Sequence, residues 1–357
     1  VHSKNQGMEY PQICWNYGRP RSDGTYDDRT RDAMIGVITH EVGHNFFPMI
    51  VNSDERQWTW MDEGLNSFIE TLTEIAFDEN FDTGNLPKDI IPYMDGDQSN
   101  ISPIMTQGGS VHQFGPNAYT KPAAGLYMLR ETIMGHELFD YAFKTYSQRW
   151  MFKHPTPEDF FRTMEDASAI DLDWFWRGWF YTTDFTDIGV KNVNQYRITS
   201  KPTNDIIKMA KKYGISEDQI RPGIYLSTDP VTKGEPKKAL DIKILKDFID
   251  SNYKNATDAE IPTYFYEITF EKPGGLVMPI IVEYTYADGS TESKTYPAQI
   301  WSKNDKEVKK VVCSKQGITQ IIIDPNLETA DVNAANNSWP KEYKSDFDRK
   351  KEELEKK

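Results

Sequence analysis

Two histidines and a glutamate lie at a spacing that can bind a metal ion. His40-Glu41-Val42-Gly43-His44 has the form HExxH, in a segment whose apolar residues recur at helical spacing. Histidines four residues apart project from one face of a helix, so both imidazoles can reach a single tetrahedral zinc ion through nitrogen. Glu41 projects beside that face, where its carboxylate can take a proton from a water molecule activated by zinc. Because short motifs also arise by chance, the motif alone leaves open a structural helix with two partly buried histidines.

A third ligand follows at the distance that a helical hairpin requires. Catalytic zinc takes three protein ligands and keeps a fourth position for water. Eighteen residues separate His44 from Glu63, which stands at the start of a second apolar helix pattern. We expect a helix, a short reversal and an antiparallel helix that returns Glu63 to the histidines. The complete set therefore favours a zinc site over a purely structural pair of histidines.

The elements that must position these ligands are two helices predicted from apolar spacing. The first begins near its cap, Asp28 or Thr30, and runs to about Phe46. The second spans about 60–77. Residues 78–118 are rich in turn-forming residues and predict a long irregular segment packed over a site. Further helical patterns lie at 119–134, 137–152, 157–167 and 171–181.

In the C-terminal half, the pattern changes from a helical period to a two-residue alternation. Strands are predicted at 264–270, 277–286, 292–301, 307–314 and 318–324. Ala287-Asp288-Gly289 is a hairpin turn signal between two of them. Short strands separated by turns predict a small β-sandwich. The fold class predicted for the whole chain is multidomain α+β, with a mainly helical catalytic domain followed by that sandwich.

Four segments are predicted along the chain. They are the catalytic domain at 1–185, a connecting region of helices and loops at 186–257, the β-sandwich at 258–328 and a charged tail at 329–357. Within the connecting region, short charged helices are predicted at about 202–213 and 239–254.

Composition and charge exclude several classes of function. The 357 residues are 38% hydrophobic, which supports a sizeable core, and their net charge of -14 predicts that nucleic acid is not a partner. No apolar run approaches the roughly 18 residues that cross a membrane, so we expect no membrane span. Cys14 and Cys313 form no CxxC pair, which excludes a cysteine-based zinc site. A long-range disulfide between them stays open, and two buried free thiols are the preferred interpretation.

Together these features resemble the M1 family of zinc aminopeptidases, a gluzincin family that includes aminopeptidase N and leukotriene A4 hydrolase. Its signature is HExxH followed after eighteen residues by Glu, which this chain has without a gap. Upstream, Gly7-Met8-Glu9-Tyr10 is similar to the family's Gly-x-Met-Glu-Asn stretch. Gln6 stands where the family has Gly, and Tyr10 replaces its Asn. These departures bear on specificity for the first substrate residue, and leave the zinc chemistry intact.

A second stretch of the family follows downstream. Tyr119-Thr120-Lys121-Pro122 is similar to the family's Tyr-x-Lys-Gly at the head of a helix, with Pro122 in place of Gly. The resemblance covers about residues 1–185, and the small sandwich also fits many members. It implies a thermolysin-like fold for the catalytic domain.

The resemblance implies one zinc ion per chain, with His40, His44 and Glu63 as its ligands. Glu41 would act as general base and then as general acid. Ligand histidines need an acceptor that orients the ring, and Glu70 lies two helical turns after Glu63 on the same face. We predict that Glu70 accepts a hydrogen bond from one of them, with a solvated carboxylate as the alternative.

The remaining site residues are also carried over from the resemblance. Tyr119 would donate a hydrogen bond to the oxyanion of the tetrahedral intermediate. Glu9, with Gly7 and Met8 beside it, would bind the free α-amino group of a peptide. A carboxylate at a fixed distance from the metal would make the enzyme an exopeptidase that removes N-terminal residues.

Family members place a large β domain before the Gly-x-Met-Glu stretch. We therefore expect the chain to be a fragment of a longer polypeptide, whose N-terminal domain packs on it. The compartment is open, and the family and composition favour secretion or the periplasm. Two other functions stay open: an endopeptidase of the thermolysin type, and a zinc-binding scaffold or binding module without catalysis.

Overall fold

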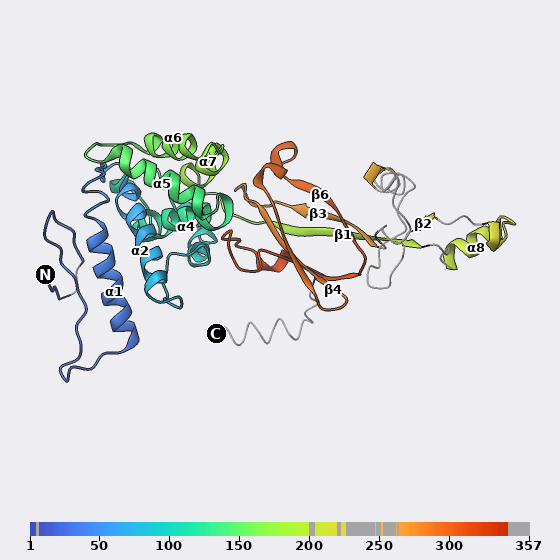
Figure 1. Cartoon of the computed structure of the whole chain (residues 1–357), viewed down its shortest axis with the longest axis horizontal. Coiled ribbons are helices and arrows are strands. Elements are labelled where there is room, and N and C mark those ends of the chain that lie inside the picture. Colours follow the sequence, from blue (N-terminus) through green and yellow to red (C-terminus); the bar gives the residue numbers. More distant parts are fainter. Residues whose placement is uncertain are drawn as a thin grey trace. The chain divides into compact units, whose positions relative to one another are not determined.

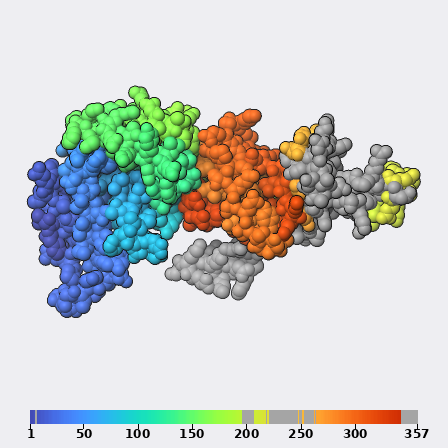
Figure 2. Space-filling view, viewed as in Figure 1, coloured from blue at the N-terminus to red at the C-terminus, as the bar shows by residue number. Residues whose placement is uncertain are grey.

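The computed structural model describes residues 1–4, 7–199, 204–219, 223–225, 247, 251–252, 262 and 264–341. The chain divides into two compact units. The first comprises Val1–Asp187, Gly274–Pro279 and Asn326–Val332, and the second comprises Ile188–Pro273, Ile280–Pro325 and Asn333–Lys357. Residues 1–187 are blue to green in Figure 1 and Figure 2, so the helices of the first unit can be followed by colour.

Two helices carry the HExxH motif and its third glutamate. α1 (Asp28–Gly43) begins after Asp27, whose carboxylate accepts a hydrogen bond from the backbone N–H of Thr30. Asp27 is therefore the cap, and the prediction of Asp28 or Thr30 is wrong by one to three residues. α1 also ends at Gly43, before the predicted Phe46. The N-terminal segment runs alongside α1 (Figure 1).

α2 (Glu63–Phe77) begins at the third glutamate itself, after a 3₁₀ turn, η1 (Thr59–Met61). Trp60 in that turn is 1% exposed, and its ring stacks on Phe161 and meets Phe180 edge-on. Buried aromatic side chains bury large areas in well-defined orientations. This aromatic anchor fixes the turn from which Glu63 enters α2.

The first unit is completed by helices around an aromatic core. Phe139, Phe160 and Trp179 lie in this core with no more than 1% of their surface exposed. The helices are α4 (Lys121–Met128), α5 (His136–Trp150), α6 (Pro157–Ser168) and α7 (Asp173–Tyr181). α4 is flanked by two π-helical turns, η5 (Pro116–Thr120) and η6 (Leu129–Ile133). The segment predicted as one helix at 119–134 is therefore helical, with an α-helical centre and π-helical hydrogen bonding at both ends.

The segment predicted as irregular, 78–118, contains short helical turns. They are η2 (Pro87–Ile90), α3 (Ile91–Met94), η3 (Gln98–Asn100) and η4 (Gly108–Ser110). Ile90, Met94 and Ile104 in this segment are each 1% exposed. Their burial packs the segment onto the helical core.

The second unit contains two four-stranded antiparallel sheets. One has the order β2-β1-β3-β6 and the other β5-β4-β7-β8. Tyr266 of the first sheet accepts a hydrogen bond at its hydroxyl from the backbone N–H of Ile318 in the second, and the rings of Phe270 and Tyr296 meet at 6.1 Å. These contacts join the two sheets into layers. The strands are β1 (Gly189–Thr199), β2 (Gly223–Tyr225), β3 (Tyr264–Glu271), β4 (Ile280–Tyr286), β5 (Thr291–Tyr296), β6 (Glu307–Ser314), β7 (Ile318–Ile323) and β8 (Ser338–Trp339).

Most strands lie where the sequence predicts them, with several differences. β2 lies in the segment predicted as helices and loops, and β8 lies within the segment predicted as a charged tail, 329–357. The predicted strand 292–301 ends at Tyr296, because Pro297 follows and a 3₁₀ turn, η8 (Ala298–Lys303), begins. β1 lies in the segment that was expected to connect domains through helices and loops. Helices and antiparallel sheets confirm the α+β class, whereas the predicted domain boundaries stay a prediction.

Other expectations fall partly within the described residues. α8 (Asn204–Lys212) agrees with the helix predicted at 202–213. The helix predicted at 239–254 and the tail after residue 341 lie outside the described residues, apart from 247 and 251–252. Cys14 and Cys313 form no disulfide with each other, and both are half-buried rather than buried. Among the described residues, no helix combines the length and the apolar character that crossing a bilayer requires.

Candidate functional site

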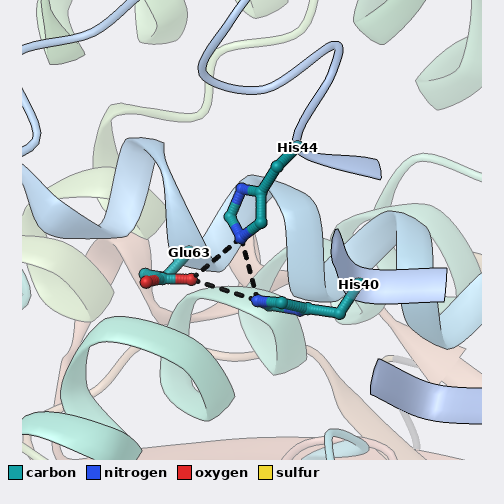
Figure 3. Close-up of side chains that lie close together, drawn as sticks. All are labelled: His40, His44 and Glu63. Carbon is teal, nitrogen blue, oxygen red and sulfur yellow. Dashed lines mark hydrogen bonds and ion pairs between the residues drawn. The ribbon is translucent and has the colours of Figure 1, made fainter. Parts of the chain in front are cut away.

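Three possible ligand atoms lie close together. They belong to His40 in α1, to His44, which caps the C-terminal end of α1, and to Glu63, the first residue of α2. Nε2 of His40 lies 3.0 Å from Nε2 of His44, and Oε2 of Glu63 lies 3.2 Å and 3.3 Å from these two nitrogens. Figure 3 shows the three side chains pointing toward one another. Zinc bonds of about 2.0–2.1 Å in a tetrahedron give ligand separations of about 3.3–3.4 Å. The observed triangle has that size to within a few tenths of an ångström.

The outer nitrogens of both imidazoles have acceptors that fix the rings. Oε2 of Glu70 lies 2.9 Å from Nδ1 of His40, as the sequence predicted, and the carbonyl oxygen of Phe47 lies 2.8 Å from Nδ1 of His44. Acceptors at Nδ1 place a proton there and leave the lone pair of each Nε2 free. Two lone pairs and a carboxylate oxygen of Glu63 then face one another. Such a group of acceptors fits a cation at its centre.

The electrostatics of these residues favour positive charge. Burial lowers the pKa of His40, but its hydrogen bonds with Glu63 and Glu70 outweigh burial and raise the pKa. Burial raises the pKa of Glu63, yet its hydrogen bonds with His40 and His44 bring the pKa below its usual range. Opposite charges nearby stabilise the charged forms of both kinds of group. Positive charge between these three side chains is therefore favoured, and a bound metal cation would supply it in place of the ring protons.

Asp62 is a buried carboxylate that the sequence analysis did not single out. Its Oδ1 lies 3.1 Å from Nδ1 of His44, although no hydrogen bond forms there because that nitrogen is directed at Phe47. Burial is the main cause that raises the pKa of Asp62. Its only sequence signal is its position directly before Glu63.

Glu41 lies beside the triangle, in contact with the N-terminal segment. It is 5% exposed, and burial raises its pKa to about 7. Gly7 packs against it so closely that a Cβ there would lie 2.2 Å from Oε1 of Glu41. Only glycine therefore allows this approach of backbone to carboxylate. A carboxylate with a pKa near neutrality suits a general base.

The N-terminal segment also brings Glu9 to the site. Glu9, Glu41 and His44 offer atoms that all lie within 4.8 Å of one another. Met8 and Trp15 exchange two backbone hydrogen bonds, of 3.2 Å and 2.8 Å, which hold the segment in an extended pair. The structure thus brings Glu9 to His44 and Gly7 to Glu41, whereas Met8 pairs with Trp15 and is exposed.

Tyr119 lies beside His40. Its ring stacks on the His40 ring, with centroids 5.8 Å apart, and its hydroxyl hydrogen-bonds Glu63. Burial and then Glu63 raise the pKa of Tyr119, so the phenol stays protonated and can donate. Lys121, two residues on, is buried, and burial lowers its pKa to about 8.

Comparison with known proteins finds one family and related enzymes. The model of the "Peptidase family M1 domain" matches residues 21–179. Glutamyl aminopeptidase of Homo sapiens is 28% identical over 176 residues, 46% of this chain and 18% of its own length. The same enzyme of Bitis rhinoceros is 30% identical over 146 residues, 39% of this chain and 15% of its own length. The chain thus spans less than a fifth of the curated relatives it matches.

A solved structure shares the fold. The crystal structure of Legionella pneumophila aminopeptidase A in complex with aspartic acid aligns with a TM-score of 0.55 at 14% identity. The alignment covers 91% of this chain and 30% of that chain.

Proposed function

We propose that this chain carries the catalytic site of a zinc aminopeptidase, because residues 21–179 match the model of the peptidase family M1 domain. The observation that carries the proposal is the convergence of three possible ligand atoms, from His40, His44 and Glu63, within 3.0–3.3 Å of one another. The related enzymes are named as aminopeptidases, which supports peptides with a free amino terminus as substrates.

The donor set fits one zinc ion held by His40, His44 and Glu63. Two nitrogens and one carboxylate oxygen are the ligands of catalytic zinc in peptidases. When bound, zinc supplies positive charge that acidifies a water molecule and polarises the scissile carbonyl. Glu70 keeps the proton of His40 on Nδ1, so that Nε2 stays available as a ligand.

Glu41 is proposed as the proton carrier of the reaction. It takes the proton of the attacking water and later delivers it to the leaving amine. Its burial supports this role, because a pKa of about 7 makes the carboxylate a better proton acceptor than an exposed glutamate. Gly7 covers one side of Glu41 and excludes water there.

Tyr119 and Glu9 are proposed to bind the two ends of the reacting residue. Tyr119 stays protonated beside the zinc ligands, and its hydroxyl donates to the oxyanion that forms on the substrate carbonyl. Glu9, close to Glu41 and His44, accepts hydrogen bonds from the α-ammonium group. A carboxylate at this position favours an exopeptidase over an endopeptidase, because an internal peptide bond offers no cation to Glu9.

The test combines metal content with hydrolysis of a panel of aminoacyl reporter amides. We expect one zinc per chain and activity that requires a free amino terminus. Glu41→Gln should retain zinc and lose activity, which also separates catalysis from a non-catalytic scaffold. Zinc without any hydrolysis would support the scaffold, and faster hydrolysis of blocked peptides would support the endopeptidase. A well-folded chain that binds no zinc would refute the proposal.

A further inference from the structure

A cavity of about 630 Å³ extends from the metal ligands toward the N-terminal end of α1. His40, Glu41 and Tyr119 line one end of it. Its other walls come from earlier residues of α1, later residues of α2 and the segment after α2. The cavity therefore begins at the reacting centre and leads away from it.

One buried carboxylate in this cavity has no partner. Glu74 is 3% exposed, and its Oε2 has no hydrogen bond. Gly36 lies opposite, and a Cβ there would lie 2.9 Å from Oε1 of Glu74. The missing side chain of Gly36 thus leaves space beside the carboxylate. An unpaired buried carboxylate is costly unless a donor or a cation meets it.

The other charged groups of the cavity are mostly acidic. Among the described residues that line it, Arg29 is the basic side chain besides His40. Glu70 is engaged with His40, and Asp32 pairs with Arg31 at 2.7 Å. Asp82, another lining carboxylate, is exposed, and Glu41 belongs to the reacting centre. Glu74 is thus the carboxylate at the inner end that is free to receive a cation.

The cation that fits is organic rather than metallic. Groups of three acidic or histidine side chains whose ligand atoms all lie within 4.8 Å occur elsewhere among the described residues, and none of them contains Glu74. A divalent ion needs several oxygen ligands at about 2.0–2.6 Å. A lysine ammonium or an arginine guanidinium can instead be bound by one buried carboxylate and a ring of neutral groups.

The position of the cavity relative to Glu9 indicates which residue of a bound peptide faces it. Glu9 lies near His44, at the C-terminal end of α1, and shares a second cluster with Glu55 and Asp62. The cavity lies at the opposite end, beyond His40. In the proposed binding mode, a peptide whose amino group meets Glu9 has its scissile bond at the zinc ligands, so its second residue can reach the cavity.

We propose that this cavity binds the basic side chain of the second residue of the substrate, through Glu74. The inference rests on the proposed function, because the position of the scissile bond is taken from it. Burial, and then the neighbouring Glu70, raise the pKa of Glu74 to about 8. An ammonium group beside the carboxylate favours its charged form and so strengthens the pair.

The test compares tripeptides that differ only at the second residue. The first residue is the one best accepted in the reporter panel, and the second is lysine or norleucine, which keeps the aliphatic stem without the ammonium group. We expect kcat/KM to favour lysine by roughly tenfold to hundredfold, the range of a hydrogen-bonded charge in a buried site. In Glu74→Gln the ratio should fall to about one. Because both substrates are measured on the same protein, loss of folded enzyme cancels from the ratio.

A matched control and a binding measurement complete the design. Glu79→Gln removes an exposed carboxylate outside the cavity and should keep the preference. Equal rates for the two peptides, or a preference that survives Glu74→Gln, would overturn the inference and leave the proposed function intact. If neither peptide is cleaved, calorimetry with the zinc-loaded Glu41→Gln chain decides. Tighter binding of the lysine peptide supports the cavity assignment, and equal binding overturns it. Absence of zinc refutes the proposed function instead.

Discussion

The hydrogen bond between Glu70 and His40 gives a graded prediction for metal affinity. The two side chains are each about 13–14% exposed, and Oε2 lies 2.9 Å from Nδ1. Acceptors of this kind contribute about tenfold to hundredfold in metal affinity, or about 1.4–2.7 kcal/mol. Glu70→Gln keeps an oxygen at the same reach and removes its charge, so we expect zinc affinity to fall about tenfold. Glu70→Leu removes the acceptor, and we expect a fall of about a hundredfold.

The measurement is zinc competition against a chromophoric chelator at fixed pH and ionic strength. Glu137→Gln, an exposed carboxylate in the first turn of α5, serves as the control for loss of one negative charge. Its affinity should stay within about twofold of the parent chain, since exposed charges are screened. If Glu70→Leu also stayed within that range, the Nδ1 contact would not position the ring, and our account of the free lone pair on His40 would be refuted.

Three further predictions concern catalysis and stability. Tyr119→Phe removes the donor to the oxyanion, so kcat should fall roughly a hundredfold or more while zinc content is unchanged; an unchanged kcat would remove Tyr119 from the reaction. The pKa of Glu41, raised to about 7 by burial, predicts that kcat/KM rises with pH through about 7, because the base must be ionised; a rate that is flat from pH 5 to 8 would contradict this role. Trp60→Ala should lower the free energy of unfolding by about 3–5 kcal/mol, measured by denaturant titration, because its ring is 1% exposed. Loss of zinc affinity in the same variant would show that the anchor also positions Glu63.

The metal triangle could be predicted from the sequence because its geometry is local. The spacing of His40 and His44 on one helix fixes their relation within a single turn, and the length of the connection brings Glu63 back to them. Glu70 followed from the same helical period. Asp62 and Glu74 could not be predicted, since their burial depends on packing between distant segments. A glutamate that is 3% exposed has the same sequence signature as a solvated one.

The fold could be predicted where the hydrophobic alternation and a turn signal indicate the same strand boundaries. The period of two and the Asp288-Gly289 turn predicted β4 and its neighbour. β1 contains Lys191 and two asparagines, Asn192 and Asn194, and it is a strand because it pairs with β3 along most of its length and with β2 at its end.

The helix pattern of α1 was read correctly, although its apolar stripe does not face the core. Met34, Ile38 and Val42 are 37%, 41% and 54% exposed, whereas Val37 is buried. Periodicity identifies a helix, and it does not say which face the fold covers.

The distribution of carboxylates around α1 explains how this helix and α2 can serve both metal and substrate. Glu63 and Glu70 contact the ligand histidines directly, Glu9 lies at one end of α1, and Glu74 lies beside the cavity at the other. Buried like charges destabilise a fold unless cations compensate them. Each proposed ligand is a cation at a different carboxylate: zinc at Glu63, the α-ammonium group at Glu9 and a basic side chain at Glu74. A cation bound at one carboxylate lowers the negative potential at the others, so binding at one of these positions does not strengthen the electrostatic attraction at the next. Peptides with both a free amino end and a basic second residue should therefore gain no electrostatic affinity from zinc, and calorimetry with the zinc-loaded and the metal-free chain measures this.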